Sequence, residues 1–237
     1  MRRAIEWAGG TNLSLTPLAH WKLDETSGLT AVDSEGGHDG MLINGPTWTP
    51  GQIDGALAFD GSDDYVDLTS DAELDDLFVG TATVMAWISP ASWGGNGYGR
   101  IFDKSSSPSA TGDGWAIRLN KDNGGLNFGQ GFTTKRGWWR FAESSIDFDT
   151  WQHIALAYDA SSTSNDPIVY MNGNPVAVTR VDAPSGDVRS DAMLDLRLGS
   201  HASAVFNVFD GSIDDARIYD RLLSAAEIAE IAKIAEI

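Results

Sequence analysis

The segment TVMAWI, residues 83–88, places bulky side chains at every second position with smaller ones between them. The segment HIALAY, residues 153–158, has the same alternation. Successive side chains of a β-strand point to opposite faces, so an alternating segment buries one face against a core. Both segments are therefore predicted to be core strands.

Similar short runs of β-branched and aromatic residues recur along the chain, separated by Gly, Asp, Asn, Ser and Pro. Asn172-Gly173 and the DNGG sequence at 122–125 are typical of hairpin turns. The pattern predicts a many-stranded antiparallel sandwich. The clearest predicted strands are 19–23, 56–59, 65–68, 81–89, 100–104, 115–119, 151–158, 168–171, 193–198 and 212–219.

Helical signals are confined to the two ends of the chain. Residues 2–8 form a short candidate helix, and Ser224 with Glu227 forms a capping box before a run of strong helix formers. Isoleucines follow at every third position, a spacing that spreads them over about half of the helix surface. This apolar stripe needs a cover, so a role in oligomerisation is expected for Ile228, Ile231, Ile234 and Ile237.

The chain of 237 residues, 42% of them hydrophobic, is long enough to bury the core of one sandwich domain. No internal repeat or change of composition divides it. We expect an N-terminal attachment segment at 1–17, the sandwich domain at 18–223 and an amphipathic helix at 224–237.

The net charge of −18, from 16 basic and 34 acidic residues, opposes binding to phosphate backbones and anionic lipid surfaces. Nucleic acid and membrane insertion are therefore not expected. The absence of cysteine excludes disulfides and thiolate chemistry. The N-terminus lacks the apolar stretch of a signal peptide, so an extracellular or virion-surface location would be reached by another route.

Eight motifs follow one another along the chain, at 20–28, 33–40, 56–66, 84–88, 151–155, 169–173, 209–219 and 223–228. Their order resembles that of the laminin G-like, concanavalin A-like lectin/glucanase jelly-roll family. This resemblance implies two antiparallel sheets packed face to face, with the first and last strands adjacent. It also implies that Trp21, Trp87 and Trp151 point into the core.

The loop DSEGGHDG, residues 33–40, combines carboxylates with glycines that let backbone carbonyls turn inward. Calcium takes six to eight such oxygen ligands. The family resemblance implies a structural calcium ion at this loop, against an aspartate of the last long strand. The plainer interpretation is that these aspartates only make turns. The expected ligands are the side chains of Asp33, Asp60 and Asp214 and the carbonyls of Gly36 and His38.

Two clusters have the composition of a sugar-binding surface, which needs a flat aromatic ring and a few planar polar groups. They are WGGNGYGR at 93–100 and KRGWWR at 135–140, the latter a positive island on an acidic chain. Such an island could bind an acidic glycan or an acidic subunit, or the tryptophans could simply cover a sheet edge. The candidate ligand-binding residues are Trp93, Asn96, Tyr98, Arg136, Trp138, Trp139 and His201.

Motifs of catalysis are missing from the sequence. Retaining glycosidases need two carboxyl groups about 5–5.5 Å apart, and no Glu-x-Asp-x-Glu triplet occurs. The leading hypothesis is a non-catalytic, calcium-stabilised lectin-like module for glycan or cell-surface recognition and adhesion. A second is a structural virion protein, such as a phage decoration, fibre or tail component, or a homo-oligomer. A glycoside hydrolase is a third.

Overall fold

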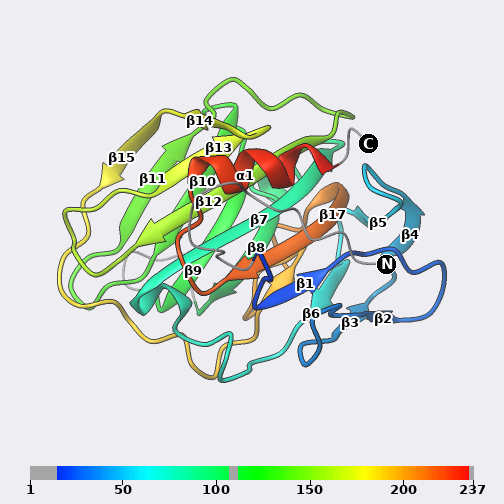
Figure 1. Cartoon of the computed structure of the whole chain (residues 1–237), viewed down its shortest axis with the longest axis horizontal. Coiled ribbons are helices and arrows are strands. Elements are labelled where there is room, and N and C mark those ends of the chain that lie inside the picture. The colour runs from blue at the N-terminus through cyan, green and yellow to red at the C-terminus, as the bar shows by residue number, and fades with distance from the viewer. Residues whose placement is uncertain (1–14, 107–111, 235–237) are drawn as a thin grey trace, which may run out of the picture.

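Two antiparallel sheets face each other in the computed structural model, which describes residues 15–106 and 112–234 (Figure 1). The predicted all-β sandwich with a C-terminal helix is confirmed. The predicted helix at 2–8 lies outside the described residues.

Sheet A has eight strands, with β7 and β17 near its middle. β7 pairs with β12 from Thr81 to Ile88, so the two alternating segments of the sequence lie side by side. Its strands are β1 (Ala19–Trp21), β4 (Thr47–Pro50), β5 (Gly55–Asp60), β7 (Thr81–Pro90), β12 (Gln152–Asp159), β13 (Ile168–Met171), β14 (Asn174–Val176) and β17 (Asp210–Tyr219).

The last strand joins the first, as predicted. Ala19 of β1 lies opposite Ile218 of β17. The earlier half of β17 pairs instead with β5, and its ladder with β7 shifts register between Asp214 and Arg217. Asp215 has a positive φ of 50° at this shift. Asp214 and Asp215 are therefore placed where β17 changes neighbours.

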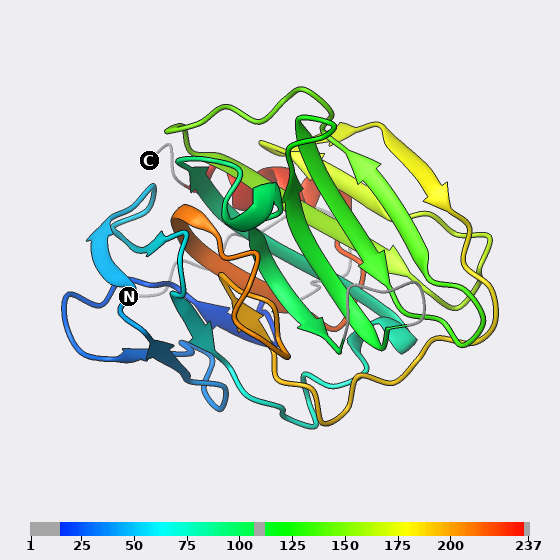
Figure 2. The ribbon, with the colours of Figure 1, turned by 180° about the vertical axis from the view of Figure 1, so that it is seen from behind.

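Sheet B has nine strands among the described residues, and Figure 2 shows it from the side away from sheet A. The predicted strand at 193–198 is shorter in the structure, where only Arg197 and Leu198 pair. The strands are β2 (Thr30–Ala31), β3 (Gly40–Ile43), β6 (Tyr65–Asp67), β8 (Arg100–Ser105), β9 (Gly114–Asn120), β10 (Gly125–Gln130), β11 (Gly137–Phe141), β15 (Val178–Asp182) and β16 (Arg197–Leu198).

An aromatic core fills the space between the sheets. The 3₁₀ turn η1 (Leu77–Val79) inserts Phe78 against Trp115 and Phe128, with ring centroids 5.1 and 5.4 Å apart. Trp21 is fully buried there, as expected. Trp87 is buried on the opposite side of sheet A, because its neighbours at 86 and 88 occupy the core face.

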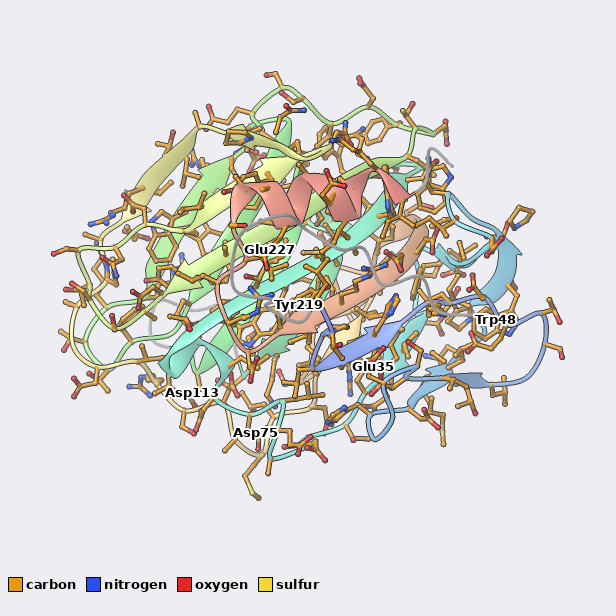
Figure 3. The ribbon with its side chains drawn as sticks, viewed as in Figure 1. Glu35, Trp48, Asp75, Asp113, Tyr219 and Glu227 are labelled. Atoms are coloured by element: carbon orange, nitrogen blue, oxygen red, sulfur yellow. The ribbon has the colours of Figure 1, made fainter. Side chains whose placement is uncertain are left out.

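Helix α1 (Ala225–Ala232) packs on the outer face of sheet A. The predicted capping box is present, with the Ser224 side chain accepting from the Glu227 backbone N–H. Ile228 and Ile231 are buried against Met85, Ala155, Tyr170, Tyr219 and Leu223. Glu227 and Tyr219, labelled in Figure 3, mark the helix and strand sides of this contact.

This contact corrects the expected role of the isoleucines. Ile228 and Ile231 are covered by the chain itself and are not available to a second copy. Each buried isoleucine contributes about 1.5–3 kcal/mol to holding the helix on the sheet. Ile234 is 42% exposed, and Ile237 lies outside the described residues. Among the described residues, no helix is long and apolar enough to cross a membrane.

Candidate functional site

The outer face of sheet B carries rows of side chains that run across three strands. Arg118, Asn127 and Arg140 are in register on β9, β10 and β11, and Trp138 is in register with Gly129 in the adjoining row. A Cβ atom on Gly129 would lie 2.4 Å from Cζ3 of Trp138. The glycine therefore lets the indole ring lie close to the sheet.

Arginine side chains stack on the aromatic rings of this face. The Arg118 guanidinium lies 4.6 Å from the ring centroid of Trp138 and 4.7 Å from that of Tyr98. Arg136 lies 4.4 Å from the Trp138 ring. These contacts join the loop before β8 to β9 and β11. We call the resulting surface the arginine–aromatic face; it comprises Tyr98, Arg100, Arg118, Arg136, Trp138, Arg140 and Arg197.

The positive charge of this face is only partly compensated. Arg100 forms an ion pair with Asp103 at 3.0 Å, and Arg136 lies 3.8 Å from Asp182. Among the described residues, Arg118 forms no ion pair. Burial, together with the nearby charges of Arg100 and Arg136, lowers the pKa of Arg118 to about 10. Arg118 is still charged at neutral pH and available to an anionic partner.

A cavity on this face is too small to enclose a sugar. Its volume is about 30 Å³, and its lining includes Arg100, Gln130, Arg136 and Trp138. That is room for about one water molecule. An oligosaccharide would therefore lie across the open surface of the sheet.

The structure brings three of the predicted ligand-binding residues together, namely Tyr98, Arg136 and Trp138. Asn96 belongs to the same loop as Tyr98, and its amide donates to the Asn207 side chain. Trp93 packs edge to face against Phe148 instead, with ring centroids 5.0 Å apart.

Two other predicted ligand-binding residues are buried. Trp139 is fully buried in the core, where its indole N–H donates to Asp166 at 2.6 Å. His201 is also fully buried, and its ring stacks on Phe206 with centroids 4.4 Å apart. Burial lowers the pKa of His201. Neither side chain is presented to a ligand.

Arg118 was not among the predicted residues, although it lies at the centre of the face. The signal available in the sequence is the alternation of β9, where Trp115, Ile117 and Leu119 point into the core. That alternation puts Arg118 on the outer face. Its proximity to Tyr98 and Trp138 depends on strand register and could not be read from β9 alone.

The predicted calcium donors do not form one coordination shell. The carboxylate of Asp33 accepts backbone N–H groups of His20, Glu35 and His38 and the Nδ1 atom of His38. Burial alone would raise the pKa of Asp33, but these bonds lower it. The His38 carbonyl accepts from the Trp21 indole at 2.7 Å. These oxygens therefore already have donors in the protein.

The other two predicted carboxylates lie elsewhere. Asp60 clusters with Asp63 and Asp64 in the turn between β5 and β6. Asp214 lines a separate cavity of about 270 Å³ on the outer side of sheet A, beside Asp24 and Asp54. The donor set predicted from sequence is therefore divided among three places, and Gly36 stays in the loop with Asp33.

Asp214 is fully buried at the wall of that cavity. Its Oδ2 atom accepts from the Ile53 backbone N–H at 2.8 Å. In the described part of the chain, no hydrogen-bond donor reaches its Oδ1 atom. Burial raises the pKa of Asp214 to about 7, with the charges of Asp215 and Asp24 adding to the effect.

Comparison with protein families settles the family. Residues 60–229 match the model of the concanavalin A-like lectin/glucanases superfamily. The chain belongs to this superfamily. A search among curated proteins found no match.

Solved structures with the same fold include binding domains and a sialidase. Domain 4 of AbnA, a GH43 extracellular arabinanase from Geobacillus stearothermophilus solved with arabinotriose, matches at 20% identity and a TM-score of 0.60, covering 91% of this chain and 98% of that one. The binding domain of botulinum neurotoxin DC, solved with rat synaptotagmin II, matches at 15% identity and a TM-score of 0.63. This match covers 92% of this chain and 51% of that one.

Trypanosoma rangeli sialidase, solved with the inhibitor DANA, matches at 12% identity and a TM-score of 0.63, covering 91% of this chain and 32% of that one. The chain thus spans nearly the whole arabinanase domain but about half of the neurotoxin binding domain and a third of the sialidase. At these identities the likeness shows the fold.

Proposed function

We propose that this chain is a non-catalytic glycan-binding module whose ligand is an anionic oligosaccharide bound across the arginine–aromatic face. The observation that carries the proposal is the placement of Arg118. Its guanidinium lies between the rings of Tyr98 and Trp138 without an acidic partner among the described residues.

The chemistry of the face matches an acidic sugar. Guanidinium groups bind carboxylates and sulfates through paired N–H donors, and they do so well at partly dehydrated sites. Five of the sixteen basic residues of the chain lie on this face, although the net charge is −18. The ring of Trp138 is half-buried and offers an apolar edge to a pyranose.

The acidic residues beside the face support a binding role over hydrolysis. Asp103 is fully buried and paired with Arg100. Asp182 pairs with Lys135 at 2.9 Å, and Asp122 accepts from the Tyr98 hydroxyl. A general acid and a nucleophile require carboxyl groups free to reach the sugar.

The proposed ligand places the module at a surface where acidic glycans are met, outside a cell or on a particle. Assembly into a larger structure has less support, because α1 buries Ile228 and Ile231 against sheet A of the same chain. The solved relatives contribute analogy only: one structure of the fold holds arabinotriose and another, from botulinum neurotoxin serotype D, holds N-acetylneuraminic acid.

The test is an array of sialylated, sulfated, uronate-containing and neutral oligosaccharides, followed by calorimetry with the strongest binder. We expect anionic glycans to be preferred and Arg118→Gln and Trp138→Ala each to weaken binding at least tenfold. Arg180→Gln is the matched control, because Arg180 is paired with Asp166 away from the face. Equal binding of neutral glycans, or unchanged binding by both variants, would refute the proposed surface.

A further inference from the structure

Two loops of the sandwich bring a buried imidazole against two carboxylates. The loop between β2 and β3 supplies His38, and the turn before η1 supplies Asp71 and Glu73. One ligand atom from each residue lies within 4.8 Å of the other two. Glu35 and Asp75, labelled in Figure 3, mark the two loops.

The His38 ring is held in a defined orientation and tautomer. Its side chain is 3% exposed, and its Nδ1 atom lies 3.0 Å from Oδ2 of the fully buried Asp33. A carboxylate can only accept, so Nδ1 carries a proton, and in the neutral ring the lone pair of Nε2 is directed to the side of Asp71 and Glu73. Histidines that bind metals commonly donate their other N–H to a carboxylate in this way.

The distances at Nε2 fit a shared ion better than hydrogen bonds. Nε2 of His38 lies 3.5 Å from Oδ1 of Asp71 and 3.5 Å from Oε2 of Glu73. Hydrogen bonds between charged groups are about 2.7–2.9 Å long. Ligands placed about 2.0–2.2 Å from a tetrahedral ion lie roughly 3.3–3.5 Å from one another.

The local backbone holds the carboxylate of Asp71 and the main chain of Glu73 in place. Oδ1 of Asp71 accepts from the Glu73 backbone N–H at 2.8 Å, and the Asp71 carbonyl accepts from the N–H of Leu74 at 2.9 Å. Leu74 is fully buried in the core and anchors the turn. The Asp71 carboxylate therefore stays beside His38, and the exposed side chain of Glu73 is free to adjust to an entering ion.

We propose that His38, Asp71 and Glu73 bind a divalent transition-metal ion of the Zn²⁺ class, with Asp33 as the positioning residue for His38. An imidazole donor favours zinc, nickel or copper over calcium, which takes oxygen ligands. Water completes the coordination shell. The ion ties the 33–40 loop of sheet B to the turn that precedes β7.

Calorimetric titration of the full chain, first stripped with a chelator, tests the site with Zn²⁺. We expect one ion per chain and a melting temperature that rises with Zn²⁺ concentration. Asp71→Asn and Glu73→Gln should each weaken binding at least tenfold, and His38→Gln should abolish it. Co²⁺ should give the visible absorption of a four-coordinate ion in the wild type. Asp60→Asn, in the other acidic cluster, is the matched control.

Several results would overturn the site. They are the absence of Zn²⁺ binding, unchanged affinity in both Asp71→Asn and Glu73→Gln, or loss of binding in Asp60→Asn. Asp71 and Glu73 have exposed side chains, so their variants test the site even if His38→Gln fails to fold. Unchanged melting temperatures of the stripped Asp71 and Glu73 variants establish that the fold is intact.

Discussion

Replacing the buried carboxylate Asp214 by asparagine should raise the free energy of unfolding of the variant relative to that of the wild type as the pH rises. In the folded chain, burial raises the pKa of Asp214 from its usual 3.8 to about 7. The folded state therefore holds a proton that the unfolded state has released across this interval. The contribution that protonated Asp214 makes to the free energy of unfolding is therefore fully present below pH 3.8 and is lost as the pH rises toward 7.

The magnitude follows from the width of the interval. One pH unit corresponds to 1.36 kcal/mol, so an interval of about three units corresponds to about 4 kcal/mol. Screening by solvent does not reduce this energy, because Asp214 is fully buried. Asparagine keeps an acceptor for the Ile53 N–H and turns its amide toward the cavity. Any cost of burying that amide shifts the unfolding free energy of the variant by the same amount at every pH. The titration of Asp214, in contrast, makes the difference from the wild type depend on pH.

Urea unfolding followed by tryptophan fluorescence at several pH values measures the difference in unfolding free energy between Asp214→Asn and wild type. We expect this difference to rise by about 1.4 kcal/mol per unit between pH 4.5 and 6.5. Asp54→Asn, at the rim of the same cavity, controls for the change in net charge. A difference for Asp214→Asn that does not vary with pH would refute the argument.

Three further predictions use other buried groups. For His153→Gln, the difference in unfolding free energy from the wild type should fall as the pH rises, opposite to Asp214→Asn. Burial lowers the pKa of His153 to about 4, so the contribution of this residue to wild-type stability is lost as the pH falls from 6.5 toward 4. A difference that rises with pH would contradict this. Ile231→Ala should cost about 2–4 kcal/mol in urea unfolding, because the side chain is buried between α1 and sheet A, whereas Ile234→Ala, at a half-exposed position, should cost less. Adding Ca²⁺ to the chain after it has been stripped with a chelator should leave the melting temperature unchanged, because N–H donors already occupy Asp33; a rise with Ca²⁺ would restore the predicted calcium site.

The strands could be predicted because their alternation is local. β7 and β12 each carry a two-residue period, and the turn at Asn172-Gly173 lies between β13 and β14 as predicted. Which face of a strand is inward depends on the neighbouring strands. The sequence could state that Trp138 and Trp139 point apart, but only the packing of β11 shows that Trp139 is the buried one.

The candidate sites depend on contacts between distant segments. Tyr98, Arg118 and Trp138 meet through the register of separate strands, and no spacing within one motif encodes that meeting. His38 and Asp71 are likewise in separate loops. The contact of helix α1 likewise could not be predicted from the sequence. The apolar stripe of the helix is evident in the sequence, but the surface that covers it is formed by four strands of sheet A, namely β7, β12, β13 and β17.

The contrast between a cationic face and an anionic chain gives the proposed glycan binding an unusual dependence on salt. About twenty excess negative charges lie away from the face, and at roughly 20 Å each repels an anion by about 0.2 kcal/mol in water. The Debye length falls from about 30 Å at 0.01 M salt to about 8 Å at 0.15 M, which removes most of this repulsion. Contacts with Arg118 and Arg136 at about 4–5 Å are screened much less.

Affinity for an anionic oligosaccharide should therefore rise between about 0.01 and 0.15 M salt and fall toward about 1 M, where the Debye length is about 3 Å. Calorimetry across this range checks the prediction, and a steady decline from the lowest salt would show that the remote acidic residues do not oppose binding.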